Sequence, residues 1–391
     1  MHVLVLPSWY PHHSQPLSGV FFREQALALH ESGYQVGVVA PILRSIRGIT
    51  SANIFKVSRP HWECDHGVAT LRQVIWALPK YQKLNMQRWL HTGEQLFAQY
   101  MEIHGKPDLI HVHSLIYAGA LAVRLKQTYG VPYVITEHSS IFLRGLVLKW
   151  QWPLIESAVQ QSSGNISVSK SLADTLTSLP CIKNKKWINI PNIVDTDFFC
   201  RNVATKPTSF RRPFVFLAAA FLTHNKGVHV LIDAVHQYLA GEQFELHIAG
   251  DGIERSNLER QARDLGVEKN IRFLGMQSRE QMRDLMQECD AFVLSSLHET
   301  FGVVLVEALA SGKPVIATQS GGPDSIVNGT NGILVPTNNT QALGTAMKNL
   351  CQKVGQFNSE LIRSNCIAAY GRVAVVKQLS AVYAAALHAY A

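Results

Sequence analysis

Two glutamates bracket the start of a predicted helix in the stretch SSLHETFGVVLVEALASGKPVIAT, residues 295–318. Glu299 lies in the polar turn before this helix, and Glu307 lies inside it. A helix start carries unpaired N–H groups and a partial positive charge, so it attracts anions, and Gly302 lets a bulky anion approach the backbone. Carboxylates accept hydrogen bonds from pairs of hydroxyl groups. This combination suits a nucleotide-sugar, although alone Glu299 would be interpreted as a helix cap and Glu307 as an exposed helical residue.

Short strand-like runs and longer helical patterns alternate along the chain that must position these residues. In the first half the predicted strands are HVLVL, YQVGVVAP, PDLIHVH, PYVITEH and NISVS, with helical patterns such as VFFREQALALHESG and LIYAGALAVRLKQTYG. In the second half FVFLAAA, FELHIAG, IRFLG, DAFVLSS and KPVIAT alternate with patterns such as GVHVLIDAVHQYLAG. Apolar strands that alternate with helices indicate parallel sheets covered on both faces. We therefore predict an α/β protein with two doubly wound, Rossmann-like domains, which bind ligands beyond the carboxyl ends of their strands.

The length of 391 residues also suits two domains. The stretch 195–214 lacks periodicity and contains prolines, so we place the boundary there. We predict an N-terminal domain at 1–200, a C-terminal domain at 201–360, and a C-terminal helix at 361–391 that packs back toward the N-terminal domain.

Composition excludes several other classes of protein. Hydrophobic residues make up 47% and charged residues 16%, which is typical of a globular chain and not of a disordered one. No apolar run reaches the ~18 residues of a membrane span, and the N-terminus lacks the basic start of a signal peptide. The six cysteines have no CxxC spacing. We interpret them as reduced thiols, which favours the cytoplasm.

The net charge is +8, and the larger share of the excess lies in the first half. In LPKYQKLNMQRWLH (78–91) and RGLVLKWQW (144–152), Lys and Arg stand beside Tyr and Trp, as they do in segments that bind an anionic membrane surface. The alternative is a solvated helix face. Because no dense basic run occurs, we expect no nucleic-acid partner. We expect a cytoplasmic protein that binds peripherally to the cytoplasmic face of the inner membrane.

Residues 291–335, AFVLSSLHETFGVVLVEALASGKPVIATQSGGPDSIVNGTNGILV, resemble the donor site of retaining glycosyltransferases of the GT-B fold. The resemblance is to the glycosyl transferases group 1 family, with its glycogen-synthase-like and mannosyltransferase-like enzymes. It extends to HNKGVHVLIDA, LHIAGDG and IRFLG, and in the first half to PLSGVFFREQALAL, PDLIHVH and TEHSS. It implies that the N-terminal domain binds the acceptor and the C-terminal domain binds the nucleotide-sugar.

The resemblance also implies roles for single residues. Lys226 matches a lysine that neutralises the donor diphosphate, Glu299 would hold the transferred sugar, and Glu307 would hold the ribose. His138 matches a histidine near the reacting carbon, and Gly19 a glycine whose loop faces the diphosphate. The predicted catalytic residues are therefore His138, Lys226 and Glu299. The predicted donor contacts are Gly19, Lys226, Gly250, Asp251, Met276, Thr300, Phe301, Gly302, Val303 and Glu307.

One position departs from the family pattern. Phe221 stands where an arginine is usual, five residues before Lys226, so a second phosphate cation is missing there. His224 and Arg255 are the candidates to replace it. Since one well-placed cation contributes several kcal/mol to a departing charge, this position bears on the stabilisation of the leaving group.

Metal chemistry is not expected. HVH (111–113) has metal-ligand spacing and DTD (195–197) resembles metal-binding acids, but the family resemblance implies metal-independent transfer without a cofactor. We predict a retaining hexosyltransferase that uses a UDP-sugar, with a GDP-sugar as the alternative. Its acceptor would be a saccharide, lipid-linked, in the biosynthesis of cell-surface polysaccharide (lipopolysaccharide, capsule or exopolysaccharide). Two alternatives stay open, a nucleotide-sugar epimerase or hydrolase on the same fold and a non-catalytic nucleotide-sugar-binding protein.

Overall fold

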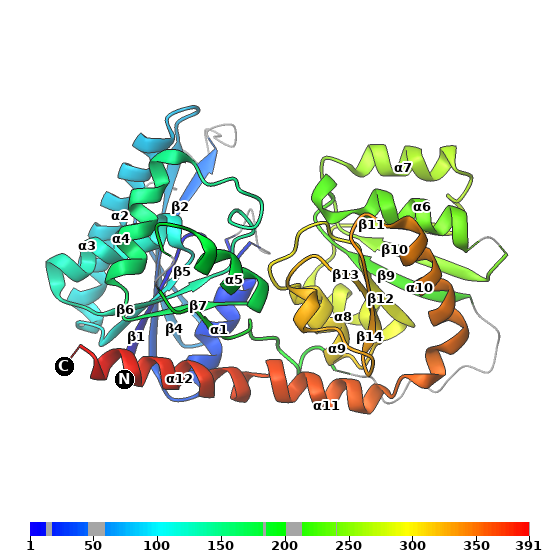
Figure 1. The fold of residues 1–391 in the computed structure, drawn as a ribbon. Coiled ribbons are helices and arrows are strands. Elements are labelled where there is room, and N and C mark those ends of the chain that lie inside the picture. The colour runs from blue at the N-terminus through cyan, green and yellow to red at the C-terminus, as the bar shows by residue number, and fades with distance from the viewer. Residues whose placement is uncertain (13–17, 46–58, 183–184, 201–212, 240, 391) are drawn as a thin grey trace. The chain divides into compact units, whose positions relative to one another are not determined.

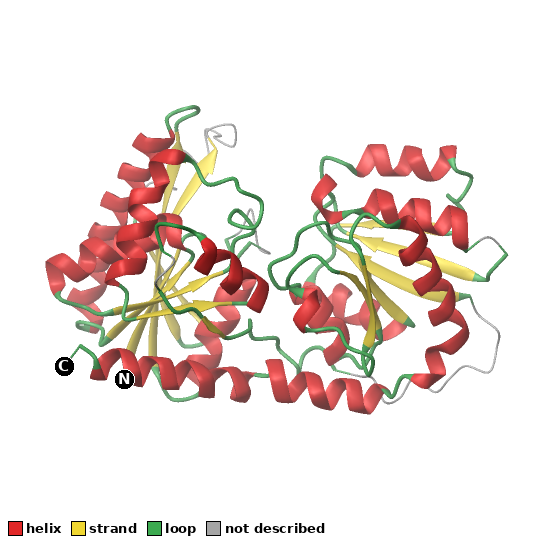
Figure 2. Ribbon diagram, in the orientation of Figure 1, coloured by secondary structure: helices red, strands yellow, loops and turns green. Residues whose placement is uncertain are grey.

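The computed structural model describes residues 1–12, 18–45, 59–182, 185–200, 213–239 and 241–390. The chain folds into two compact units, each with a sheet and covering helices (Figures 1 and 2). Unit 1 comprises Met1–Val168, Leu172–Ile193 and Val375–Ala391, and unit 2 comprises Ser169–Ser171 and Val194–Ala374. The predicted α/β class with two parallel-sheet domains is confirmed. The residues around the predicted boundary, 201–212, lie outside the described residues.

Unit 1 contains an eight-stranded sheet in the order β3-β4-β2-β1-β5-β6-β7-β8. Its strands are β1 (His2–Pro7), β2 (Gln35–Ser45), β3 (His61–Asp65), β4 (Val68–Ala77), β5 (Leu109–His113), β6 (Tyr133–Glu137), β7 (Gly164–Ser167) and β8 (Ile188–Asn189). Neighbouring strands run parallel except for the hairpin of β3 and β4 at one edge. The central strands β1, β5 and β6 are buried along their whole length, which explains why their sequences are apolar without alternation.

Helices cover the sheet of unit 1. They are α1 (Val20–Glu31), α2 (Gln82–His104), the π-helical turn η2 (Leu115–Gly119), α3 (Ala120–Tyr129), the 3-10 turn η3 (Lys149–Gln151), α4 (Trp152–Gln161), α5 (Lys170–Ser178) and α12 (Arg372–His388). The last helix, drawn in red in Figure 1, is far from the others in sequence. Its residues Val375, Leu379 and Tyr383 are buried in the same apolar cluster as Val3 and Val5 of β1.

Unit 2 contains a six-stranded, fully parallel sheet in the order β11-β10-β9-β12-β13-β14. Its strands are β9 (Phe214–Ala219), β10 (Phe244–Ala249), β11 (Ile271–Gly275), β12 (Ala291–Leu294), β13 (Val315–Thr318) and β14 (Gly332–Val335). Its helices are η4 (His224–Lys226), α6 (Val228–Tyr238), α7 (Arg255–Asp264), α8 (Arg279–Glu288), α9 (Val303–Ala310), η5 (Pro323–Ser325), α10 (Thr340–Lys353), η6 (Val354–Gln356) and α11 (Ser359–Tyr370).

Each sheet has a point at which the strand order reverses direction along the chain. In unit 2 this switch point lies between β9 and β12, and in unit 1 it lies between β1 and β5. Ligands of doubly wound sheets bind in the crevice beyond the carboxyl ends of the strands at such a point. The loops that follow these four strands are therefore the expected location of functional side chains.

None of the helices in the described part of the chain combines the length and apolar character that a membrane span requires. All six cysteines are free thiols.

Candidate active site

Lys226 and Glu299 meet at the switch point of unit 2. The Lys226 ammonium donates a hydrogen bond of 2.7 Å to Glu299 Oε2. Their side chains are 25% and 15% exposed, so the pair is accessible to a ligand but partly shielded from water. Ser296 Oγ lies 3.4 Å from the same carboxylate oxygen. The sequence predicts that both residues contact the donor, and the structure adds that they bind each other.

The backbone around this pair explains its position. Lys226 ends the turn η4 after β9, and Glu299 follows β12, so neighbouring parallel strands carry both residues to one edge of the sheet. The two loops are joined because Leu297 N donates to the carbonyl of Asn225 (2.8 Å). Gly227 has φ +64°, and a Cβ there would lie 2.0 Å from the carbonyl oxygen of Ser295. Only glycine allows this close approach of the two loops.

The start of α9 lies directly beyond Glu299. Gly302 is the N-cap of α9 with φ +95°, and the first-turn amides belong to Val303 and its successor. Such amides have no intrahelical acceptor, so they offer donors to an anion. Thr300 and Phe301 are buried beneath this turn, with the ring of Phe301 5.9 Å from that of Tyr370.

The GG turn after β13 supports the backbone of Glu299 from the other side. Glu299 N donates to Ser320 O (2.9 Å), and Gly322 N donates to Glu299 O (2.7 Å). A Cβ on Gly322 would lie 2.5 Å from the Cα of Phe301. The glycine pair Gly321-Gly322 therefore allows the loop after β12 and the loop after β13 to pack together.

The other predicted donor contacts of unit 2 lie on loops and a helix that follow strands of the same sheet. Glu307 is partly buried on α9. Gly250 and Asp251 follow β10, and Gly250 N donates to Gly275 O (2.8 Å), which joins the β10 loop to the β11 loop. Met276, next in the β11 loop, is exposed. All of these residues lie at the carboxyl edge of the sheet, as the sequence predicts.

Phe221 occupies the position where the family has an arginine, and His224 and Arg255 are the two candidate replacement cations. Phe221 lies in the loop after β9 and is 55% exposed. Arg255 donates to Glu259 Oε1 (2.8 Å) and to Asp251 Oδ2 (3.2 Å), so its charge is already compensated. His224 is exposed, and its ring lies 4.5 Å from that of His229 in a stacked arrangement. Neither candidate replacement stands as close to Glu299 as Lys226, which contacts it directly.

His138 follows β6 in unit 1 and belongs to a group of three histidines. His138 Nε2 lies 3.0 Å from Nδ1 of His113, and the rings of His113 and His111 stack at 4.3 Å. Burial lowers the pKa of His111 from its usual 6.5 to about 3. Burial also lowers the pKa of His113 and of His138 well below 6.5, and the nearby imidazole of His111 adds to this effect. All three imidazoles are therefore neutral at pH 7.

The two sequences with metal-like spacing have other partners. His111 uses both ring nitrogens within the protein, Nδ1 with Tyr383 Oη (2.6 Å) and Nε2 with Thr136 Oγ1 (2.7 Å). Asp195 of the DTD sequence accepts hydrogen bonds from Arg279 (3.1 Å) and Arg372 (2.8 Å). Across the described part of the chain, no group of three or more His, Cys, Asp or Glu side chains is arranged to hold a metal ion.

Gly19 lies immediately before α1, with φ +78°. A Cβ there would lie 3.0 Å from the ring of Trp9 and 3.0 Å from the ring of Phe22. The Trp9 and Phe22 rings themselves are 5.1 Å apart. Gly19 therefore holds the Trp9 indole in place through close packing, a role that the sequence did not indicate.

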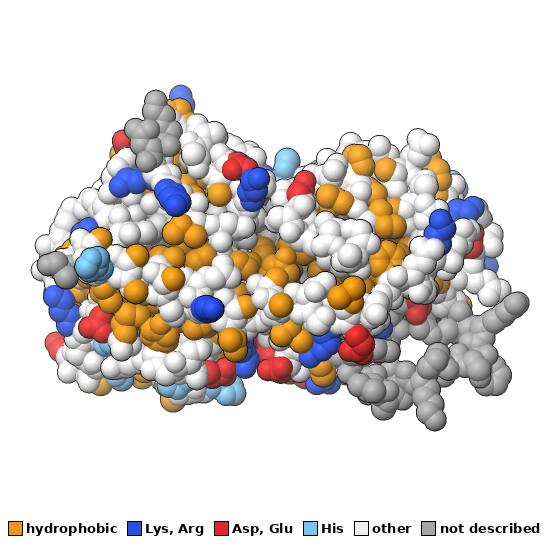
Figure 3. Space-filling model, turned by 60° about the horizontal axis from the view of Figure 1, so that its bottom comes forward, with side chains coloured by type: hydrophobic (Ala, Val, Ile, Leu, Met, Phe, Trp, Pro, Cys, Tyr) orange, Lys and Arg blue, Asp and Glu red, His pale blue; other side chains and the backbone are white. Residues whose placement is uncertain are grey.

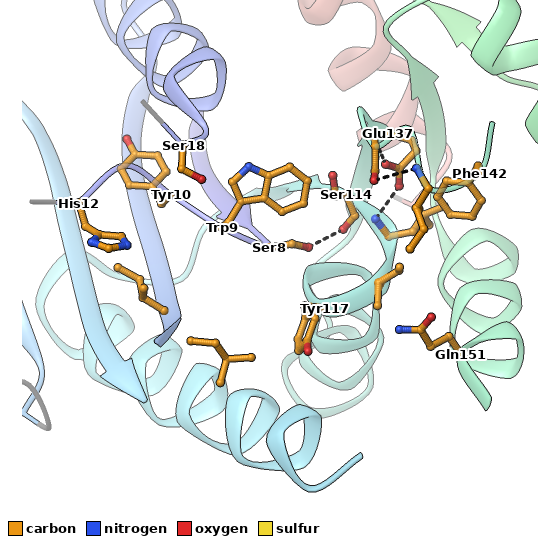
Figure 4. A pocket seen from close by; sticks show the side chains of 16 residues that line it. Ser8, Trp9, Tyr10, His12, Ser18, Ser114, Tyr117, Glu137, Phe142 and Gln151 are labelled. Atoms are coloured by element: carbon orange, nitrogen blue, oxygen red, sulfur yellow. Dashed lines mark hydrogen bonds between the residues drawn. The ribbon is translucent and has the colours of Figure 1, made fainter. Parts of the chain in front are cut away.

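A cavity of about 350 Å³ opens at the carboxyl edge of the unit 1 sheet. Figure 4 shows Trp9 near its centre, with Tyr117, Glu137, Phe142 and Gln151 around it. The full lining consists of Ser8, Trp9, Tyr10, His12, Ser18, Ile42, Leu43, Ser114, Leu115, Ile116, Tyr117, Glu137, Ser139, Ile141, Phe142 and Gln151. The predicted residues Gly19 and His138 do not line it, although sequence neighbours of both do.

None of the residues that line this cavity was singled out from the sequence, and Glu137 is the one carboxylate among them. It is fully buried, and its carboxylate accepts hydrogen bonds from the amides of Leu115 (2.8 Å), His138 (2.8 Å) and Ser139 (2.6 Å). Burial raises the pKa of Glu137 above its usual value, while these hydrogen bonds oppose the shift. Ser114, between β5 and η2, has φ +70°, a strained value for a serine. A carboxylate at the last position of a strand, beside a candidate histidine, was the available signal.

Both units match known protein families. Residues 202–361 match the family model described as Glycosyl transferases group 1, and residues 18–198 match the model described as Glycosyltransferase Family 4. The chain is 26% identical over 361 residues to TuaC of Bacillus subtilis, whose name proposes a glycosyltransferase of teichuronic acid biosynthesis. That alignment covers 89% of this chain and 88% of TuaC. An uncharacterized glycosyltransferase of Methanocaldococcus jannaschii, MJ1178, is 30% identical over 278 residues, which cover 69% of this chain and 72% of MJ1178.

Solved structures share the fold. Sucrose-phosphate synthase from Thermosynechococcus elongatus superposes with a TM-score of 0.81 at 20% identity, over 100% of each chain. HepE of Anabaena in complex with UDP superposes with a TM-score of 0.73 at 20% identity, over 98% of this chain and 100% of HepE.

Proposed function

The chain belongs to the glycosyl transferases group 1 family, and from this premise we propose that it is a retaining, metal-independent hexosyltransferase. Like its family, it acts on a nucleotide-sugar. The donor binds at the carboxyl edge of the unit 2 sheet, and a saccharide acceptor supplies the attacking hydroxyl group. The observation that carries this proposal is the contact between Lys226 and Glu299 at the switch point of that sheet.

In this proposal Lys226 provides a cation for the donor diphosphate, and Glu299 provides a carboxylate for the transferred sugar. When a diphosphate arrives beside the start of α9, its oxygens compete with Glu299 for the Lys226 ammonium. Glu299 is then released to accept hydrogen bonds from hydroxyl groups of the transferred sugar. The ion pair thus keeps both charges compensated until the donor exchanges partners with them.

We propose that transfer retains the configuration at the anomeric carbon. The oxygen of the acceptor hydroxyl bonds to the anomeric carbon on the face from which the diphosphate leaves, and the bond from that carbon to the phosphate oxygen breaks. The proton of the hydroxyl passes to the departing phosphate, whose charge Lys226 and the α9 amides stabilise. His138 is neutral at pH 7, so beside an oxocarbenium-like carbon it would not repel the developing positive charge.

We propose a UDP-sugar as the donor, because HepE, which shares the fold, binds UDP. The test is a thermal-shift panel with UDP, GDP and ADP. A nucleotide at about one hundred times its dissociation constant stabilises the protein by ~2.7 kcal/mol. UDP should raise the Tm, and a rise with GDP alone would assign the alternative base.

Two variants test the roles within the pair. Lys226→Met should lose ~1.5–3 kcal/mol of nucleotide binding, the usual contribution of a hydrogen bond to a charged group. Lys348→Met, on an exposed lysine of the same unit, is the matched control and should bind normally. Glu299→Gln should bind the nucleotide yet transfer sugar ~10–100-fold more slowly. Near-normal transfer by Glu299→Gln would contradict the assignment, and a wild-type protein that binds the nucleotide but transfers sugar to no acceptor would favour a non-catalytic function.

The acceptor that we propose is a lipid-linked saccharide of a cell-surface polysaccharide. The name of TuaC, which mentions teichuronic acid biosynthesis, supports the polysaccharide part of this proposal. Two exposed apolar segments at the carboxyl edge of the unit 1 sheet support a membrane contact. Leu78 and Tyr81, the latter 64% exposed, adjoin exposed Lys80, and Leu146 and Leu148 are also exposed. Alternating lysine and apolar side chains suit an anionic membrane surface.

One part of the sequence-based membrane prediction is wrong. Trp89 is 1% exposed, and its indole N–H donates to Pro41 O (2.8 Å), so it cannot reach a membrane. On the face drawn in Figure 3, Lys and Arg side chains are scattered and form no continuous basic area. The proposed contact therefore depends on the two segments named above. Flotation with anionic liposomes at low salt should recover the wild type and lose a Tyr81→Glu variant, and failure of the wild type to float would exclude this contact.

A further inference from the structure

We infer that the cavity of unit 1 holds one uncharged sugar ring of the acceptor and discriminates against a ring that carries a carboxylate or phosphate. This inference rests on the proposed function, because it assigns a chemical class to the acceptor of that reaction. Three properties of the cavity support it, namely its charge, its aromatic walls and its polar rim.

The charge of the lining excludes an anionic occupant. Neither Lys nor Arg is among the described residues that line the cavity, and Glu137 is its one carboxylate. Glu137 already receives three backbone amides, so these donors are not available to a ligand. An anionic ligand would lose its hydration without gaining a cation, and it would share the cavity with a buried carboxylate. His12 is the one basic side chain of the lining.

The walls of the cavity present aromatic faces. Trp9, Tyr117 and Phe142 come from the loops after β1, β5 and β6, so three neighbouring strands deliver them to one place. Their rings offer flat apolar area at low conformational cost. The C–H face of a pyranose is a flat apolar surface of the same kind. Packing of Trp9 against Phe22 and Gly19 means that this face is preformed.

Polar groups at the rim match the hydroxyl groups of a sugar better than they match an alkyl chain. Gln151 accepts from Leu148 N through its amide oxygen (2.9 Å), and its amide nitrogen is turned toward the cavity (Figure 4). Ser18 and Ser139 add hydroxyl groups to the lining. Ser139 Oγ already accepts from Ile141 N (3.3 Å), but a lipid chain would offer no partner to the Gln151 amide nitrogen or the Ser18 hydroxyl, which is unfavourable. The lipid part of the acceptor therefore lies outside the cavity.

Glu137 acts here as a positioning residue as well as a source of charge. Its carboxylate joins Leu115, at the start of η2, to Ser139 in the loop after β6. Tyr117 belongs to η2 and Phe142 follows Ser139, so Glu137 sets the distance between two aromatic walls. The strained backbone of Ser114 lies in the same connection.

Ligand-observed saturation-transfer NMR on the full chain, without donor, tests the inference. The probes are methyl α-glucoside, methyl α-mannoside and methyl α-galactoside, each compared with a carboxylate-bearing partner such as methyl α-glucuronide, and octanol as an alkyl probe. At least one uncharged glycoside should bind, and its glucuronide-type counterpart should bind ~10-fold more weakly or worse. Equal binding of the two, or binding of octanol in place of every glycoside, would overturn the inference.

Variants assign the signal to the cavity. Trp9→Ala should abolish glycoside binding, whereas Trp62→Ala on β3 is the matched control and should retain it. Glu137→Gln should bring the affinities for the uncharged glycoside and its charged counterpart closer together. If Glu137→Gln does not fold, Trp9→Ala still tests whether the glycoside binds in the cavity. The UDP-induced rise in Tm is measured on every variant. A variant that loses glycoside binding but keeps nucleotide binding is altered only in the cavity. A wild type that binds nucleotide but no glycoside would refute the inference and leave the proposed function standing.

Discussion

The buried imidazole of His111 should make unit 1 less stable in acid. His111 lies in the middle of β5 with no exposed surface, and burial lowers its pKa from 6.5 to about 3. In the unfolded chain its pKa returns to ~6.5. Between these two values the unfolded state binds one proton more than the folded state at this site, so the free energy of unfolding falls as the pH falls.

The magnitude follows from the pKa difference. Each pH unit below ~6.5 should remove ~1.4 kcal/mol of stability through this one site, and ~2 kcal/mol between pH 6.5 and pH 5. From about one pH unit above ~6.5 the site is neutral in both states and contributes no pH dependence. His111→Gln removes the titrating group and also loses hydrogen bonds to Tyr383 and Thr136, so it should be less stable at pH 7.5 but should lose stability less steeply in acid.

Urea unfolding followed by tryptophan fluorescence measures this effect selectively. All seven tryptophans precede residue 194, so their emission reports on unit 1. Between pH 5 and pH 6 the free energy of unfolding of the wild type should change more steeply than that of His111→Gln, by ~1.4 kcal/mol per pH unit. His61→Gln, at an exposed position on β3, is the control and should keep the wild-type slope. Equal slopes for wild type and His111→Gln would refute the reasoning.

Two further predictions concern the backbone and the C-terminal helix. Gly227→Ala places a Cβ 2.0 Å from the carbonyl oxygen of Ser295 at a positive φ, so this variant should displace Lys226 and abolish the UDP-induced rise in Tm. Gly266→Ala is the control, because Gly266 also has a positive φ but has open space around it. The control should lose only ~1 kcal/mol of stability and should bind UDP normally. Tyr383→Phe removes the hydroxyl that contacts Nδ1 of His111 and should destabilise unit 1 by ~1 kcal/mol in the same fluorescence assay, while a wild-type value would mean that this hydrogen bond adds nothing to stability.

Much of unit 2 could be predicted because its signals are local. Its strands are short apolar runs followed directly by polar turns, and parallel strands end at a common edge. Lys226 and Glu299 were therefore expected at that edge. Their mutual hydrogen bond was not, because the register of β9 against β12 is set by tertiary packing and is not encoded in either segment alone.

Unit 1 was harder to predict for physical reasons. Strands β3 and β4 lie outside the predicted runs, because β4 near the edge mixes polar with apolar residues and is only partly buried. Trp89 stands among charged residues of α2 yet faces the core, so the local composition misled the membrane prediction. Glu137 gave no periodic signal, since its importance comes from three amides on two separate loops.

The return of α12 to unit 1 has a consequence for synthesis. Unit 1 needs Val375–Ala391 to complete its core, whereas unit 2 ends at Ala374. On the ribosome, where domains generally fold as they emerge, the unit whose chain begins first is thus the unit whose core is completed last. Until Tyr383 arrives, the apolar surface that α12 covers stays open on the nascent chain, available to chaperones.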